Sequence, residues 1–219
     1  MSVNLEFKGI IDVILNNFKQ IMDIKPFQPS VNRLIRKDYL AAMEKIEGDL
    51  KPNINFIPEE EAISFLNEYV FQNLQKHSDE IGDSLRQELQ RGLLNKETAK
   101  QLKQRIKNVF NDSKYTNRLK TVIRTERIRA SNKGALDGAT QAQESGVKLK
   151  KYLDAVLDDR TTDICKAEDR KYGSKEQAIP LDQDFIVKVG NKTYKALAPP
   201  FHINCRTVLR FVQEKEDGN

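Results

Sequence analysis

Apolar side chains recur at every third or fourth position through most of the first 145 residues, and this period constrains the fold more than any other feature of the chain. Such a period places the apolar side chains on one face of a helix, and that face must be buried. It predicts helices over residues 7–22, 31–46 and 63–89, with a shorter helix over 99–109. The third of these is one long helix unless Gly82 divides it.

A further helix is predicted from Lys120 to Ser145, where Gly146 ends it. Asn95 is expected to cap the shorter helix over 99–109. Small residues gather in the second half of the 120–145 helix and allow another element to approach closely, so we expect this half to be buried against the domain that follows. These small residues are Ala130, Ser131, Gly134, Ala135, Gly138 and Ala139.

The period changes to that of strands after the long helix. Residues 149–157 are typical of a strand, and a last strand is predicted over 207–212. Two strand-like runs, 185–189 and 193–197, flank the pair Gly190-Asn191, which supplies the positive φ that a tight hairpin turn requires. The predicted fold class is therefore α+β: a helical N-terminal region joined by a long basic helix to a small C-terminal α+β domain with a β-hairpin.

We expect three parts: a helical N-terminal region over residues 1–90, a compact domain over 91–212 and a flexible tail over 213–219. With 38% hydrophobic and 32% charged residues, the chain of 219 residues holds enough periodic apolar side chains to bury a core. No apolar run approaches the roughly 20 residues of a membrane-spanning helix, so we expect a protein of the cytoplasm with no membrane partner. Two cysteines make no disulfide framework.

Basic residues are concentrated in one segment. Lys and Arg exceed Asp and Glu by only five in the whole chain, yet six bases and a single acid, Glu126, lie between positions 118 and 133. On a helix these bases form two groups beside the apolar line, where they can contact the phosphates of double-stranded DNA or an acidic protein surface. Pairing with nearby acids is the alternative interpretation. The six bases are Arg118, Lys120, Arg124, Arg127, Arg129 and Lys133.

Both cysteines and one of the two histidines form a candidate zinc site. His202-x-x-Cys205 places two soft ligands a short turn apart, and Cys165 offers a third ligand from a distant loop. A structural zinc site takes four ligands, so Asp159 or Asp163 would have to supply the fourth. A core cluster without metal is the alternative.

The same residues allow a catalytic interpretation, with Cys165 as nucleophile, His202 as base and an aspartate to orient the histidine. The rigid pair Pro199-Pro200 beside His202 is equally typical of a structural turn. No glycine-rich phosphate loop and no paired catalytic carboxylate motif supports catalysis, and we predict that the protein is not an enzyme.

Several short motifs then occur in a defined order. Arg124-Thr125-Glu126 lies on the long helix, Asp159-Arg160-Thr161 follows the first strand with Cys165 four residues on, and the run Pro199-Pro200-Phe201-His202-Ile203-Asn204-Cys205-Arg206 precedes the last strand. In order and spacing these motifs resemble the phage Mu protein F-like family over residues 90–212. The members of that family are minor head proteins, also called head morphogenesis proteins, of tailed viruses.

The resemblance implies a protein of few copies per particle, from a tailed virus or a provirus. It implies association with the portal protein and with the major capsid or scaffolding protein, at the portal vertex or capsid interior, after assembly in the host cytoplasm. Many relatives carry Cys-x-x-Cys in the Asp-Arg-Thr segment, whereas Thr162 stands at the first of those cysteines here. Some relatives are fused to toxin domains, and we expect none in this chain.

We therefore predict a non-enzymatic virion assembly factor that contacts packaged DNA through the 118–133 helix. Cys165, His202 and Cys205 are expected to tie the turn after the Asp-Arg-Thr loop to the last strand. Glu126 is expected to lie near the domain junction and balance an arginine, with Arg160 and Arg206 as the candidates. The alternatives are a zinc-supported nucleic-acid-binding protein and a Cys/His-dependent enzyme.

Overall fold

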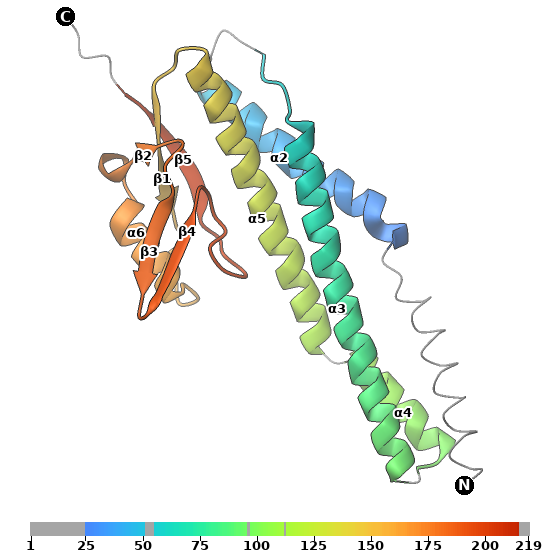
Figure 1. Ribbon diagram of the computed structural model, residues 1–219. Coiled ribbons are helices and arrows are strands. Elements are labelled where there is room, and N and C mark those ends of the chain that lie inside the picture. Colours follow the sequence, from blue (N-terminus) through green and yellow to red (C-terminus); the bar gives the residue numbers. More distant parts are fainter. Residues whose placement is uncertain (1–24, 51–54, 96, 112, 215–219) are drawn as a thin grey trace, which may run out of the picture. The chain divides into compact units, whose positions relative to one another are not determined.

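The computed structural model describes residues 25–50, 55–95, 97–111 and 113–214 (Figure 1). The helix predicted over 7–22 lies outside these residues. The described helical elements are η1 (Lys25–Phe27), α2 (Gln28–Leu50), α3 (Glu60–Leu94), α4 (Ala99–Asn111), α5 (Ser113–Glu144), α6 (Asp163–Tyr172) and η2 (Lys175–Gln177). The described strands are β1 (Leu149–Asp154), β2 (Ile179–Pro180), β3 (Phe185–Val189), β4 (Lys192–Ala196) and β5 (Val208–Gln213). Helices followed by antiparallel strands confirm the α+β fold class.

The chain divides into two compact units. Among the described residues, unit 1 holds 25–29 and 69–122, and unit 2 holds 30–68 and 123–214. Residues 90 and 91, between which the domain boundary was expected, both lie within α3. Gln213, the first residue of the expected tail, is the last residue of β5, and residues 215–219 lie outside the described residues.

Unit 1 is built on the apolar stripe of α3. Ile81, Leu85 and Leu89 are buried against Val109 of α4. α3 continues without interruption through Gly82, so the single long helix is the correct alternative.

The N-terminus of α4 differs from the prediction. The cap of α4 is Thr98, not Asn95. The Thr98 hydroxyl accepts from the N–H of Gln101, and the side-chain oxygen of Gln101 accepts from the N–H of Thr98. This reciprocal capping box satisfies two backbone donors at once.

Unit 2 is centred on the small-residue face of α5. Ala135, Ala139 and Ala142 are buried with Leu149 and Leu153 of β1, as expected for contact with the domain that follows. The same face also receives α2, which was not predicted.

Gly134 permits the approach of α2 to α5. A Cβ atom at this position would overlap the backbone carbonyl of Tyr39. Tyr39 is fully buried, and its hydroxyl donates to Asp137 of α5 at 2.6 Å. The absence of a side chain at Gly134 is therefore a requirement of the packing between α2 and α5.

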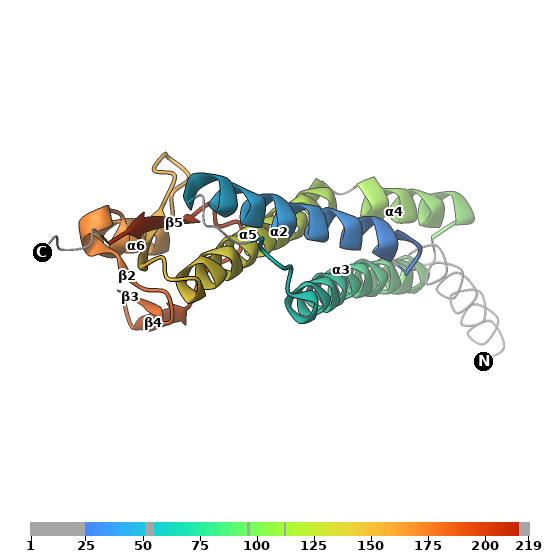
Figure 2. The same cartoon turned by 90° about the horizontal axis from the view of Figure 1, so that it is seen from above.

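Two antiparallel sheets complete unit 2 (Figure 2). The first has the strand order β2-β1-β5, so β5 is an edge strand. The second is the predicted hairpin of β3 and β4, whose turn contains Gly190 at φ 57°. Fully buried Lys151 joins the strands to their loops, since its Nζ donates to the carbonyls of Leu181 at 2.6 Å and Leu197 at 2.8 Å.

Neither a helix nor a strand was predicted over residues 163–172, where the structure has α6. Thr162 caps this helix by accepting from the N–H of Cys165 at 3.3 Å, and Gly173 follows its last residue. Its buried face consists of Cys165, Glu168 and Tyr172. A helix of ten residues with two polar residues on its buried face carries too weak an apolar stripe to be recognised by period alone.

Candidate functional site

The Arg-Thr-Glu motif of α5 holds the loop that precedes β5. Arg124 donates to the side-chain oxygen of Asn204 at 3.0 Å, and the hydroxyl of Thr125 accepts from the N–H of Asn204 at 2.8 Å. The φ of Asn204 is 63°, in the left-handed region that asparagine adopts more readily than most other residues with a side chain, and these two bonds hold it in this conformation. Two motifs eighty residues apart in the sequence thus form one structural element.

The third member of this motif, Glu126, pairs with an arginine as predicted, but that arginine is Arg129 and neither of the two suggested partners. Its side chain is 3% exposed and accepts from Arg129, one helical turn away, at 2.9 Å. Arg160 and Arg206 instead both contact Asp158. A neighbour on the same helix reaches Glu126 more easily than a residue of a distant loop.

Asp158 ties the Asp-Arg-Thr loop to the approach of β5. Arg206 donates to both of its carboxylate oxygens, at 2.6 and 2.7 Å, and this pairing holds the pKa of Asp158 well below its usual value. Thr161 accepts from the N–H of Asp158 at 2.6 Å and donates to the carbonyl of Val156. The motif residue Asp159 is exposed.

Asn132 of α5 binds three backbone groups at and before the start of β5. Its amide nitrogen donates to the carbonyls of Pro199 and Thr207, and its amide oxygen accepts from the N–H of Leu209 at 2.9 Å. The peptide bond between Pro199 and Pro200 is cis. Asn132 was not recognised as important because no local pattern marks it.

Cys165, His202 and Cys205 come together in unit 2. Their ligand atoms all lie within 4.8 Å of one another, and the Cys165 Sγ is 2.9 Å from the His202 Nε2. Cys165 and Cys205 are buried at 6% and 0% exposure. Hydrogen bonding with Cys205, and then with His202, lowers the pKa of Cys165, whereas the same bond to Cys165 and burial raise the pKa of Cys205.

The donor set fits a zinc ion at three of four positions. Two sulfur atoms and an imidazole nitrogen are the ligands that zinc prefers, and zinc-binding histidines commonly bind a backbone carbonyl through the other ring nitrogen. His202 does so, because its Nδ1 lies 2.8 Å from the carbonyl oxygen of Ile203. Nε2 is thereby left to face the two sulfur atoms.

The carboxylates proposed as the fourth ligand lie elsewhere. Asp159 is exposed, and the side chain of Asp163 is 81% exposed and pairs with Lys166 at 3.7 Å. As the first residue of α6, Asp163 points its carboxylate to solvent at the positive end of the helix dipole. Instead, the hydroxyl of Thr162 lies 3.1 Å from the Nε2 of His202.

Glu168 is the residue of this site that the sequence analysis missed. It is fully buried one turn after Cys165, and Thr207 donates to its Oε2 at 3.0 Å. Its Oε1 has no hydrogen-bond partner among the described residues. Burial, together with the charge of Cys165, raises the pKa of Glu168 to about 7. The spacing Cys165-x-x-Glu168 would have identified it if α6 had been predicted.

The contact between Cys165 and His202 also meets the distance condition of the catalytic alternative. The Cys165 thiol is buried, however, and its neighbours are a second thiol and the hydroxyls of Thr162 and Thr207. A buried thiol between other donors is typical of a structural or metal-binding cysteine.

Five of the six basic residues on α5 have polar partners. Arg118 pairs with Glu80, Arg127 with Asp38 at 2.7 Å, and Lys133 with Asp137. Arg124 and Arg129 bind Asn204 and Glu126, as described above. The sixth, Lys120, has no ion pair with any residue in the described part of the chain.

The sequence of this chain was also compared with known protein families. The sequence matches the family described as Phage Mu protein F like protein over residues 79–210, more than half of the chain. The chain belongs to this family. Searches of curated proteins and of solved structures returned no match.

Membership of this family confirms the resemblance that the motifs indicated. The structure shows what the motif residues do: they hold one another through hydrogen bonds. In this member of the phage Mu protein F-like family, Arg124, Thr125 and Arg206 make hydrogen bonds that position the loop before β5. The family is one of structural phage head proteins rather than a known enzyme family. Among the described helices, none is both long enough and apolar enough to cross a membrane.

Proposed function

We propose that this protein is a minor capsid protein that associates with the portal vertex and the inner capsid during assembly of a tailed-phage head. Family membership supports a role in head morphogenesis. The observation that carries the proposal is that the family motifs hold one another in place: Asn204 is bound by Arg124 and Thr125, and Asp158 by Arg206. These bonds fix the loop before β5, and we infer that this loop is part of the surface that the portal protein contacts.

Co-expression with the portal protein of the same genome tests this proposal directly. We expect the full chain to co-purify with the portal protein, and we expect mass spectrometry to find it in proheads at few copies. Arg206→Ala removes the double contact to Asp158 and should weaken co-purification, whereas Lys192→Ala on the exposed hairpin is the matched control. Absence of the protein from both proheads and mature particles contradicts the proposal.

We further infer that Cys165, His202 and Cys205 hold one zinc ion that ties α6 to the loop before β5. The support is the convergence of their ligand atoms and the contact of His202 Nδ1 with a carbonyl. Zinc would act there as a structural crosslink. Thr162, at the position of a family cysteine, leaves the fourth ligand to its hydroxyl or to water.

Metal analysis with two variants tests the zinc site. We expect purified protein to carry about one zinc ion per chain, and Thr162→Cys to bind zinc more tightly in competition with a chromogenic chelator because a thiolate replaces a hydroxyl. Thr162→Ser keeps the hydroxyl that caps α6 and is the matched control. Zinc-free protein in both the wild type and Thr162→Cys contradicts this inference.

Double-stranded DNA is a further proposed partner of α5. Lys120 is exposed without an ion pair in the described chain, but Arg124 and Arg127 would have to exchange Asn204 and Asp38 for phosphates. We therefore expect weak binding to a duplex that falls steeply as salt rises. Fluorescence anisotropy should show that Arg124→Ala/Arg127→Ala lowers the affinity for the duplex further. The charge-matched Lys188→Ala/Lys192→Ala should leave that affinity unchanged. Affinity that is independent of salt contradicts DNA contact.

A further inference from the structure

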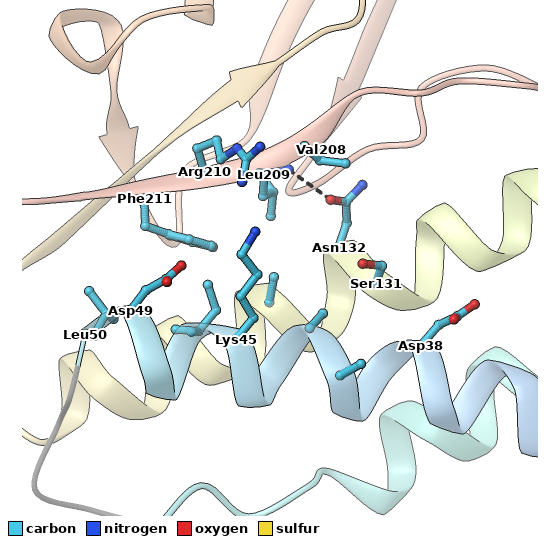
Figure 3. A pocket seen from close by; sticks show the side chains of 14 residues that line it. Asp38, Lys45, Asp49, Leu50, Ser131, Asn132, Val208, Leu209, Arg210 and Phe211 are labelled. Carbon is cyan, nitrogen blue, oxygen red and sulfur yellow. Dashed lines mark hydrogen bonds between the residues drawn. The ribbon is translucent and has the colours of Figure 1, made fainter.

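A groove of about 410 Å³ lies within unit 2, and its lining includes none of Cys165, His202 and Cys205 (Figure 3). One helix, α2, and the edge strand β5 run along opposite sides of it, and α5 contributes to its wall. Its apolar lining includes Ala42 and Ile46 of α2, with Leu209 and Phe211 of β5. This volume is typical of sites that bind ligands or short peptides.

The strand beside the groove, β5, has one edge with which no described strand pairs. β1 pairs with β5 on one side, and no strand of the described chain pairs with β5 on the other. The N–H of Leu209 is directed away from β1, because it donates to Asn132. Backbone groups alternate in direction along a strand, so the N–H and C=O of Phe211 also face outward. No partner for these groups occurs among the described residues.

Asn132 already occupies the first position of a neighbouring strand. Its side-chain amide donates to the carbonyl of Thr207 and accepts from the N–H of Leu209. One residue of an added parallel strand would make the same two bonds. Asn132 therefore satisfies the outward backbone groups at one end of this edge, whereas those of Phe211 remain open. An added strand can bind the backbone of Phe211 and continue the pattern of hydrogen bonds.

Charges on the groove indicate the kind of segment that fits. Asp38 pairs with Arg127 and Arg210 pairs with Asp154, so these two charges are compensated. Lys45 and Asp49 of α2 are exposed and have no ion pair in the described part of the chain. Figure 3 shows Lys45 extending from α2 toward β5 across the groove.

The spacing of these two charges matches that of a strand. Lys45 and Asp49 are four residues apart on a helix, which places them about 6 Å apart along its axis. Residues two apart on an extended chain are separated by nearly the same distance and point to the same side. A strand with an acidic residue followed or preceded two positions away by a basic residue would therefore complement both.

We propose that the groove binds an extended segment of another protein, which adds to the open edge of β5 as a strand. The segment carries an aliphatic side chain for the apolar floor and an acidic and a basic residue two positions apart for Lys45 and Asp49. The groove lining includes neither Asn204 nor Asp158 nor the residues that bind them, so this proposal and the proposed role in head assembly can fail independently.

Selection from a yeast-displayed library of random 12-residue peptides tests this proposal on the full chain. Wild-type protein should enrich peptides with the acidic-x-basic pattern beside aliphatic residues. Lys45→Glu changes an exposed side chain, and it should shift the enriched residue opposite position 45 from acidic to basic. No enrichment, or an unchanged pattern with Lys45→Glu, overturns the proposal.

The backbone contribution is tested with two substitutions at one position. Phe211→Pro removes the outward N–H but no bond to β1, as prolines do on edge strands, whereas Phe211→Ala removes only the ring. An enriched peptide should bind Phe211→Pro at least ten-fold more weakly than Phe211→Ala by fluorescence anisotropy, with both variants folded by circular dichroism. Equal affinities overturn strand addition. A wild-type dimer that Phe211→Pro dissociates, with no peptide enriched, assigns the edge to a second copy instead and also overturns the proposal.

Discussion

Glu168 shows how one buried side chain can make the stability of unit 2 depend on pH. It is fully buried, it receives one hydrogen bond from Thr207, and burial raises its pKa to about 7 from an ordinary value of 4.5. Below pH 4.5 the carboxyl is protonated in both folded and unfolded chains. Between these two values the unfolded chain releases its proton first, so the stabilising contribution of Glu168 is lost as pH rises toward 7.

We expect Glu168→Gln to stabilise the metal-free protein at pH 8 by about 1–3 kcal/mol and to change it little at pH 4.5. Glutamine keeps the acceptor for Thr207 but has no proton to lose. Urea unfolding at the two pH values measures the effect, with the exposed Glu144→Gln as the matched control. A wild-type protein whose stability rises from pH 4.5 to pH 7 while Glu168→Gln follows it closely would contradict this account of Glu168.

At the scale of elements, the approach of α2 to α5 depends on the absence of side chains. Gly134 lies against the backbone of Tyr39, which cannot move aside as a flexible side chain could. Gly48, also within a helix, has open space where a Cβ would stand. Equal changes at these two glycines should therefore have opposite effects.

We expect Gly134→Ala to destabilise the protein by about 2 kcal/mol or more, because the added methyl group forces α2 and α5 apart. Gly48→Ala should instead be neutral or stabilising by up to about 1 kcal/mol, since alanine favours the helix more than glycine does. Chemical denaturation of the two variants alongside the wild type provides the measurement. Equal loss of stability in both would show that Gly134 has no special packing role.

At the scale of the whole molecule, two cores stabilise two units. Leu85 is 1% exposed in the core of unit 1, and Leu153 is fully buried in the core of unit 2. α3 and α5 belong partly to each unit, so the boundary is not marked by a linker between helices.

Truncation of one core residue in each unit tests this division. Leu85→Ala and Leu153→Ala should each cost about 2–5 kcal/mol of the unfolding free energy. Hydrogen exchange should locate the loss: Leu85→Ala should accelerate exchange in α4, and Leu153→Ala in β1 and β5. If either variant accelerates exchange evenly through both units, the chain unfolds as one cooperative body.

Much of the architecture could be predicted because it depends on neighbours in the sequence. The apolar stripe of α3, the end of α5 at Gly146 and the turn at Gly190 are set by helical period, by positive φ and by turn geometry. α6 escaped prediction because its buried face includes Glu168, whose hydrogen-bond donor is Thr207, a residue of the loop before β5.

The sequence by itself determined the α+β class, the hairpin, the family and the three residues of the cysteine and histidine cluster. Only the tertiary structure decided the partners: Asp38 for Arg127, Asp158 for Arg206, and Thr162 and Glu168 beside Cys165. Local periods and caps act over a few residues, whereas ion pairs and buried hydrogen bonds join residues that folding alone brings within about 3 Å. The groove beside β5 likewise exists only where three distant segments meet.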